Sequence, residues 1–88
     1  MPRIRKTAAQ VAEEARKNRE RLFLGTLYKY RMAAGYLSWE LAAPFLMMSK
    51  ATLFRRLRNP ETFTLDELHR IVLALHIPTD EISDIIFS

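Results

Sequence analysis

Apolar residues recur at helical spacing along most of this chain, and no segment alternates apolar and polar residues as a strand would. Phe23, Leu27, Tyr30 and Ala34 share one face of a helix predicted from about residue 19 to residue 34, and Gly35 is placed to end it in a left-handed conformation. The same spacing recurs later at Ile71, Val72, Leu75, Ile82, Ile85 and Ile86. The pattern predicts an all-α chain of five or six helices.

The pattern is weaker before residue 19. Between residues 7 and 19 only a thin stripe of small apolar side chains stands among charged ones, formed by Ala8, Val11, Ala12 and Ala15. Because alanine buries little apolar area, this stripe predicts a marginal helix, and the sequence leaves open whether residues 7–34 form one helix or two. We therefore divide the chain into a basic arm with a marginal helix (1–18) and a helical domain (19–88).

Polar residues mark where three of the helices are expected to begin. Ser38 can cap a helix that starts at residue 39, and Ser49 can cap one over residues 50–57. Thr64 and Glu67 have the spacing of a capping box, in which each side chain accepts a hydrogen bond from the other residue's backbone. Pro78 then interrupts the helical pattern before a last short helix.

The helix predicted after Ser49 is unusually basic. Leu53 and Leu57 are four residues apart and can anchor one face, whereas Lys50, Arg55 and Arg58 fall largely on other faces. Between residues 50 and 58 the chain carries four cations and no carboxylate, so nothing within this segment neutralises them. Two short helices joined by a tight turn, the second one basic, suit insertion into a DNA major groove.

The overall charge of +4 hides a strong asymmetry along the chain. Residues 1–58 carry thirteen Lys and Arg against four Asp and Glu, a balance of +9, whereas residues 59–88 carry one Arg against six acids, a balance of −5. Such segregation favours a polyanionic partner. The alternative is a solubility bias with no partner behind it.

Residues 38–57 resemble the helix-turn-helix of the phage repressor and Cro-like (XRE-class) family. In the ungapped match, Ala43 takes the small position where the two helices touch, and Leu53 takes the central core position of the recognition helix. Two residues depart from the family pattern: Met47 stands where a glycine with positive φ is usual, and Pro44 lies inside the first motif helix. The leucine-rich and acidic segments after residue 60 resemble the family as well. The match covers roughly residues 20–83 and implies a compact lambda-repressor-like bundle.

The resemblance implies site residues, carried over one by one. Base-reading positions fall on Lys50, Ala51 and Arg55, and Lys and Arg suit the O6 and N7 acceptors of guanine. Phosphate or secondary contacts fall on Trp39, Ser49, Thr52 and Arg58. The alternatives are that Lys50 and Arg55 are ordinary solvated cations and that Trp39 belongs to the core or to an interface.

Two further surfaces are expected at the ends of the chain. Arg3, Arg5 and Lys6 form a possible minor-groove arm, although short basic tails are often merely disordered. Ile82 and Ile86 are expected to face the protomer's own core, which leaves Ile85 and Phe87 for the interface of a homodimer that reads two half-sites. The alternative is that all four side chains close the monomer core.

Other kinds of site are not indicated. The chain has no cysteine and only two glycines, which argues against thiolate metal sites and glycine-rich phosphate loops. His69 and His76 are seven residues apart, whereas metal-binding pairs on helices prefer three or four. We expect no enzyme activity, cofactor, metal or small-molecule ligand, and no membrane segment, because no apolar run approaches about 20 residues.

The sequence therefore predicts a cytoplasmic, nucleoid-associated transcriptional regulator that binds double-stranded DNA sequence-specifically, with residues 49–58 in the major groove. An alternative is a protein-interaction module on the same fold, such as an antirepressor or an assembly adaptor. Pro44, Met47 and Met48 keep this alternative open, because an altered turn with exposed methionines suits a protein-binding surface.

Overall fold

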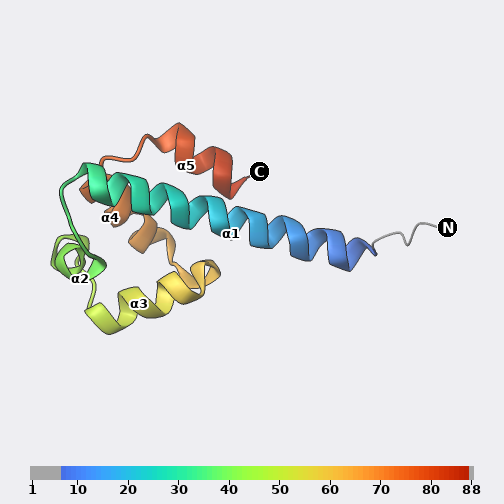
Figure 1. The fold of residues 1–88 in the computed structure, drawn as a ribbon, viewed down its shortest axis with the longest axis horizontal. Helices are drawn as coiled ribbons and strands as arrows, with labels where there is room; N and C mark the ends of the chain where they lie inside the picture. Colours follow the sequence, from blue (N-terminus) through green and yellow to red (C-terminus); the bar gives the residue numbers. More distant parts are fainter. Residues whose placement is uncertain (1–6, 88) are drawn as a thin grey trace.

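The computed structural model describes residues 7–87, and these residues form helices and connecting turns without a strand (Figure 1). Two short 3₁₀-helices, η1 (Ala43–Leu46) and η2 (Pro60–Thr62), follow the second and third α-helices. The α-helices are α1 (Ala8–Ala33), α2 (Trp39–Ala42), α3 (Lys50–Arg58), α4 (Leu65–Leu75) and α5 (Thr79–Ile86). The predicted all-α bundle is confirmed, with five α-helices among the described residues.

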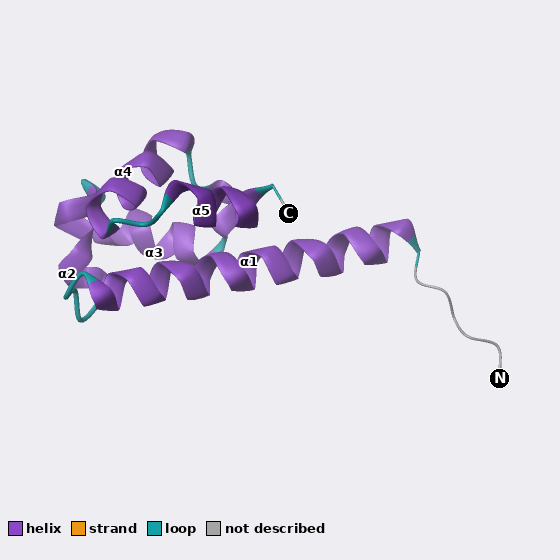
Figure 2. Cartoon of the chain, turned by 90° about the horizontal axis from the view of Figure 1, so that it is seen from above, coloured by secondary structure: helices purple, strands orange, loops and turns teal. Residues whose placement is uncertain are grey.

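The sequence left open whether residues 7–34 form one helix or two, and the structure has one continuous helix, α1, between the caps Thr7 and Ala34. Thr7 and Gln10 make a capping box: the Thr7 hydroxyl accepts from the Gln10 backbone at 3.1 Å, and the Gln10 side chain accepts from the Thr7 backbone at 2.8 Å. Gly35 follows the helix with φ of +91°, the left-handed conformation expected of it. Residues 7–15 are all exposed, and this part of α1 projects beyond the bundle (Figure 2).

The core joins every α-helix around the C-terminal half of α1. Its fully buried large side chains come from α1, η1, α3 and α4, namely Leu27, Leu46, Leu53, Ile71 and Leu75. The last helix, α5, contacts α1 and adds Ile82, which is 7% exposed. The Lys29 ammonium on α1 also pairs with the Glu81 carboxylate on α5 at 2.9 Å. The helical spacing seen in the sequence therefore marks the inner faces, except at Ala34, which follows the end of α1 and is exposed.

The three predicted N-caps are confirmed. The side chains of Ser38, Ser49 and Thr64 each accept a hydrogen bond from the backbone N–H three residues later, at 3.1 to 3.2 Å. Glu67 completes the expected capping box by accepting from the Thr64 backbone at 2.9 Å. These caps fix where α2, α3 and α4 begin, and so they orient α3 against the rest of the bundle.

Pro44 changes the helix that contains it. The segment is α-helical only as far as Ala42 and continues as the 3₁₀-helix η1, where Pro44 lies in the first turn and its missing N–H leaves no interior bond unmade. Met47 then takes a left-handed conformation, with φ of 54°. This is the positive φ expected at this turn position from the resemblance of residues 38–57 to a helix-turn-helix. Arg70 on α4 steadies the turn by donating from Nη1 to the Met47 carbonyl at 2.6 Å.

Candidate nucleic-acid interface

α3 presents one side to the core and the other to solvent. Leu53 has no exposed surface and anchors the inner side. On the other side, Ala51, Arg55 and Arg58 have the spacing i, i+4, i+7, which places them on a common face, and all three are exposed. α3 thus offers an exposed basic face that its own core contact holds in place.

Lys50, in the first turn of α3, has a partner that the segment itself did not reveal. Its ammonium lies 3.2 Å from the carboxylate of Glu40 on α2, so a neighbouring helix supplies the counter-charge that residues 50–58 lack. Both side chains are more than half exposed, at 62% for Lys50 and 57% for Glu40, and such pairs are weak. The contact places the first turns of α2 and α3 side by side.

The arginines of α3 have different environments. Arg55 and Arg58 are exposed, and neither makes an ion pair within residues 7–87. Arg56 instead turns inward, and its Nε donates to the Glu67 carboxylate on α4 at 3.1 Å. Leu57, the next residue, packs against the core. The two outward arginines are therefore available to a ligand.

Glu67 holds the inward arginine in place electrostatically. Burial alone would raise the pKa of this carboxyl group, whose side chain is only 8% exposed. The hydrogen bond from the Thr64 backbone and the charge and hydrogen bond of Arg56 outweigh burial, so the pKa of Glu67 lies below its usual value. The carboxylate is therefore ionised at neutral pH and ties α3 to α4.

Two of the predicted secondary contacts already make bonds within the fold. The Ser49 hydroxyl donates to the Thr52 hydroxyl at 2.9 Å and accepts from the Thr52 backbone at 3.2 Å. Trp39 is half-buried and packs against the core. Ser49 and Thr52 lie at the N-terminal end of α3.

Arg31, at the end of α1, is a buried cation that the sequence did not single out. It is 7% exposed, and its Cζ lies 5.1 Å from the centre of the Trp39 ring and 4.8 Å from that of Tyr28. Its burial depends on where α2 docks, which no local pattern in the sequence records. Its spacing of four from Leu27 on the core face was the one available signal.

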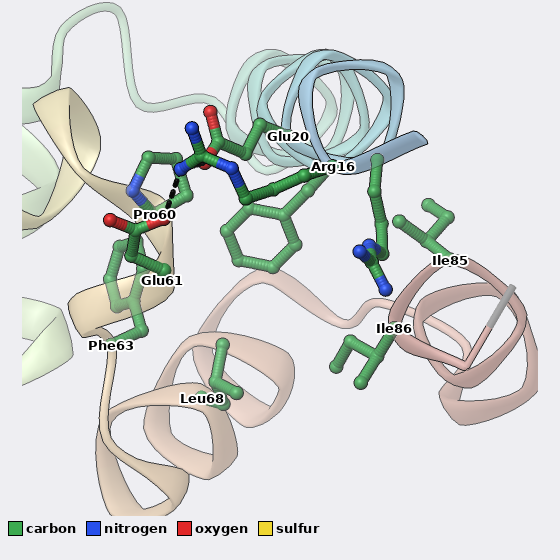
Figure 3. A pocket seen from close by; sticks show the side chains of 10 residues that line it. Arg16, Glu20, Pro60, Glu61, Phe63, Leu68, Ile85 and Ile86 are labelled. Atoms are coloured by element: carbon green, nitrogen blue, oxygen red, sulfur yellow. Dashed lines mark hydrogen bonds and ion pairs between the residues drawn. The ribbon is translucent and has the colours of Figure 1, made fainter. Parts of the chain in front are cut away.

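A separate apolar groove of about 330 Å³ lies between α1, η2, α4 and α5 (Figure 3). Phe23, Phe63 and Leu68 contribute to its lining, and the ion pair between Arg16 and Glu61, at 2.6 Å, crosses its rim.

Two isoleucines of α5 complete this groove. Ile85 and Ile86 are both half-buried against the core, so the expectation that Ile85 is exposed is corrected. Phe87 is 85% exposed, as expected for its proposed interface. The C-terminal end of α5 therefore leaves one large apolar side chain in solvent, that of Phe87, rather than two.

Other predicted features do not gather into a site. Within residues 7–87, no group of three or more His, Cys, Asp and Glu side chains is arranged to hold a metal ion, and His69 and His76 are both exposed. None of the helices in this range is long and apolar enough to cross a membrane. The predicted arm residues Arg3, Arg5 and Lys6 lie outside the described part of the chain.

The chain matches no protein-family model, no curated protein and no solved structure.

Proposed function

We propose that this protein is a sequence-specific regulator that binds double-stranded DNA, with α3 in the major groove and the fold of a lambda-repressor-like helix-turn-helix domain. One observation carries the proposal: α3 is anchored inside by Leu53 and exposes Ala51, Arg55 and Arg58 on its opposite face. Arg55, together with Lys50 at the start of the helix, can donate to guanine O6 and N7, and Arg58 can contact phosphate.

The charge distribution supports the same proposal. Several acids of the C-terminal half pair with cations of the N-terminal half, as in Arg16 with Glu61, Lys29 with Glu81 and Arg56 with Glu67. Arg55 and Arg58 are outside these pairs. Among residues 7–87, the cations outside ion pairs lie on two elements: Lys17, Arg19, Arg21 and Arg31 on α1, and Arg55 and Arg58 on α3. The two on α3 belong to the element proposed to enter the groove, as direct recognition of DNA requires.

A titration against DNA selected from a random pool tests the proposal. If a dimer neutralises about eight phosphates, the slope of log K against log salt should be roughly −7 or steeper. The same selection reveals the preferred site, and a scrambled duplex of equal length serves as the control. The absence of binding to the selected pool at low salt would refute the proposal.

A second candidate function is favoured by a different surface. Leu41, Phe45 and Met47, on α2, η1 and the turn after it, are 56%, 63% and 76% exposed. Exposed apolar side chains so close together suit a protein partner, as an interaction module on this fold would need. The DNA titration separates the two functions, since an interaction module would bind DNA without sequence preference or not at all.

A further inference from the structure

Arg31 is a buried cation whose hydrogen-bonding capacity the fold leaves almost unused. A guanidinium carries five N–H donors and no acceptor. The Arg31 Nε–H is buried and has no partner, and Nη2 donates only to the Met32 thioether at 3.4 Å, which is a weak acceptor. No carboxylate among residues 7–87 pairs with it. Because burying a charge without a paired anion is costly, the site is incomplete as it stands.

The other inward-facing arginines show what a completed site looks like. Arg56 lies 3.1 Å from the Glu67 carboxylate. The Nε of Arg70 is also without a partner, but its terminal nitrogens reach the Met47 carbonyl at 2.6 Å and the Asp66 carboxylate at 3.1 Å. Arg31 makes no hydrogen bond to either kind of oxygen among residues 7–87. Its neighbours are the rings of Tyr28 and Trp39, which attract the cation but supply no acceptor in the plane of the guanidinium.

The contacts of Arg31 connect it with the start of the proposed recognition helix. Trp39 begins α2, and the next residue, Glu40, lies 3.2 Å from Lys50 at the start of α3. Arg31 is thus linked by successive contacts to the first turn of the proposed recognition helix. The DNA backbone passes beside such a helix when the helix enters the major groove. The planar guanidinium can donate to two oxygens of one phosphate at once, which a lysine cannot do.

We propose that Arg31, held between its contacts with Tyr28 and Trp39, binds a phosphate of the DNA backbone next to α3. This inference rests on the proposed DNA-binding function and adds a contact that fixes the register of α3 on the duplex. The aromatic neighbours keep the guanidinium in one orientation before DNA arrives, so little side-chain freedom is lost on binding.

Salt titrations of variants with selected DNA test the inference. Arg31→Met should weaken binding on the order of tenfold and make the salt slope shallower by about 0.9 for each copy, or about 1.8 for the proposed dimer, because each copy loses one phosphate contact. Arg31→Lys should keep the slope but lose affinity, because it retains the charge without the planar pair of donors. Lys17→Met, which removes an exposed cation about four turns earlier on α1, is the matched control and should change the slope less.

A purely structural role for Arg31 predicts a different result. In that case Arg31→Met would lower affinity at every salt concentration through poorer folding and would leave the slope at the wild-type value, which would overturn the inference. If the wild type binds with the expected slope, that outcome refutes only the Arg31 contact. If the wild type binds no DNA, the proposed function and this contact fail together.

The wild-type protein gives a second test if Arg31→Met does not fold. The Arg31 side-chain Nε–Hε resonance in ¹⁵N NMR should move and become protected from exchange with solvent when selected DNA is added. The exposed Arg21 on the same helix serves as the reference resonance. An Arg31 resonance that is unchanged at saturating DNA would refute the contact without the use of a variant.

Discussion

At the scale of single residues, Glu67 is the carboxylate on which α3 and α4 most depend. Its side chain accepts from Arg56 Nε at 3.1 Å and from the Thr64 backbone at 2.9 Å. Glu67→Gln preserves the shape but removes the charge, so we expect the free energy of unfolding at pH 7 to fall by about 1.5–3 kcal/mol. Urea denaturation measures this change. Asp84→Asn, which removes the charge of an exposed carboxylate on α5, is the control.

The same substitution should alter the pH dependence of stability. The pKa of Glu67 is lowered in the folded protein, so its stabilisation is present above the ordinary carboxyl pKa of about 4.3 and is lost as pH falls through the lower folded value. The difference in unfolding free energy between wild type and Glu67→Gln should therefore be constant above about pH 5.5 and shrink in acid. A difference that stayed the same down to pH 2 would show that the charge of Glu67 contributes nothing.

Arg55 and Arg58 are both exposed arginines of α3 but are expected to have different roles. Arg55→Ala should cost about 1–3 kcal/mol at the preferred site and flatten the preference at one base pair. Arg58→Ala should weaken binding to all sequences alike, because a phosphate contact carries no sequence information. Affinities for a panel of single-base variants of the site measure both effects. An equal, sequence-independent loss in both variants would reduce Arg55 to a phosphate contact.

At the scale of elements, the turn before α3 contains a strained residue. Met47 has φ of 54° and is 76% exposed, so its side chain contributes little to the core. A left-handed conformation costs a side-chain-bearing residue about 1–2 kcal/mol, and glycine loses roughly 0.5–1 kcal/mol of that gain in chain entropy. Met47→Gly should therefore stabilise the fold by about 0.5–1 kcal/mol.

Thermal unfolding of three proteins checks this prediction. Met47→Ala serves as the control, because it removes the side chain but keeps the strained backbone, and it should not raise the melting temperature. If the alanine and glycine variants melted together, the backbone of Met47 would not be the source of the strain.

The elements that the sequence predicted well are those whose signals are local. Ser38, Ser49 and Thr64 begin helices because each hydroxyl bonds to a backbone only three residues away, and such spacing is visible in the sequence. The effect of Pro44 was harder to predict, since a proline at that position can kink, end or change the type of a helix. The contacts of Lys50 and Arg31 depend on how α2 docks against its neighbours, which no local pattern records.

At the scale of the whole molecule, the folded chain brings its oppositely charged halves together. Glu61 and Glu81 neutralise Arg16 and Lys29 on α1, so the strong charge asymmetry of the sequence is smaller on the folded surface. The cations that remain outside ion pairs among residues 7–87 lie on α1 and α3. Because α3 is the element proposed to enter the major groove, substitutions on it should affect DNA affinity more than equal changes in net charge elsewhere.

The C-terminal end of α5 leads to a prediction about assembly. Phe87 is 85% exposed and directly follows Ile85 and Ile86, which line the apolar groove beside α1. A single α3 can read only a few base pairs, so specific binding usually needs two copies about one DNA turn apart. We expect a homodimer in which Phe87 and the edge of Ile85 from each copy make a self-complementary contact.

Sedimentation at micromolar concentration, with and without selected DNA, measures this assembly. Phe87→Ser should shift the protein toward monomer and weaken DNA binding, because the two half-sites are then occupied independently. Leu65→Ser removes a side chain that is 81% exposed on α4, and it should leave the assembly unchanged. The comparison separates a specific contact from general surface hydrophobicity. A protein that sediments as a monomer in every condition, whatever stands at position 87, would mean that the isoleucines of α5 serve only to close the monomer core.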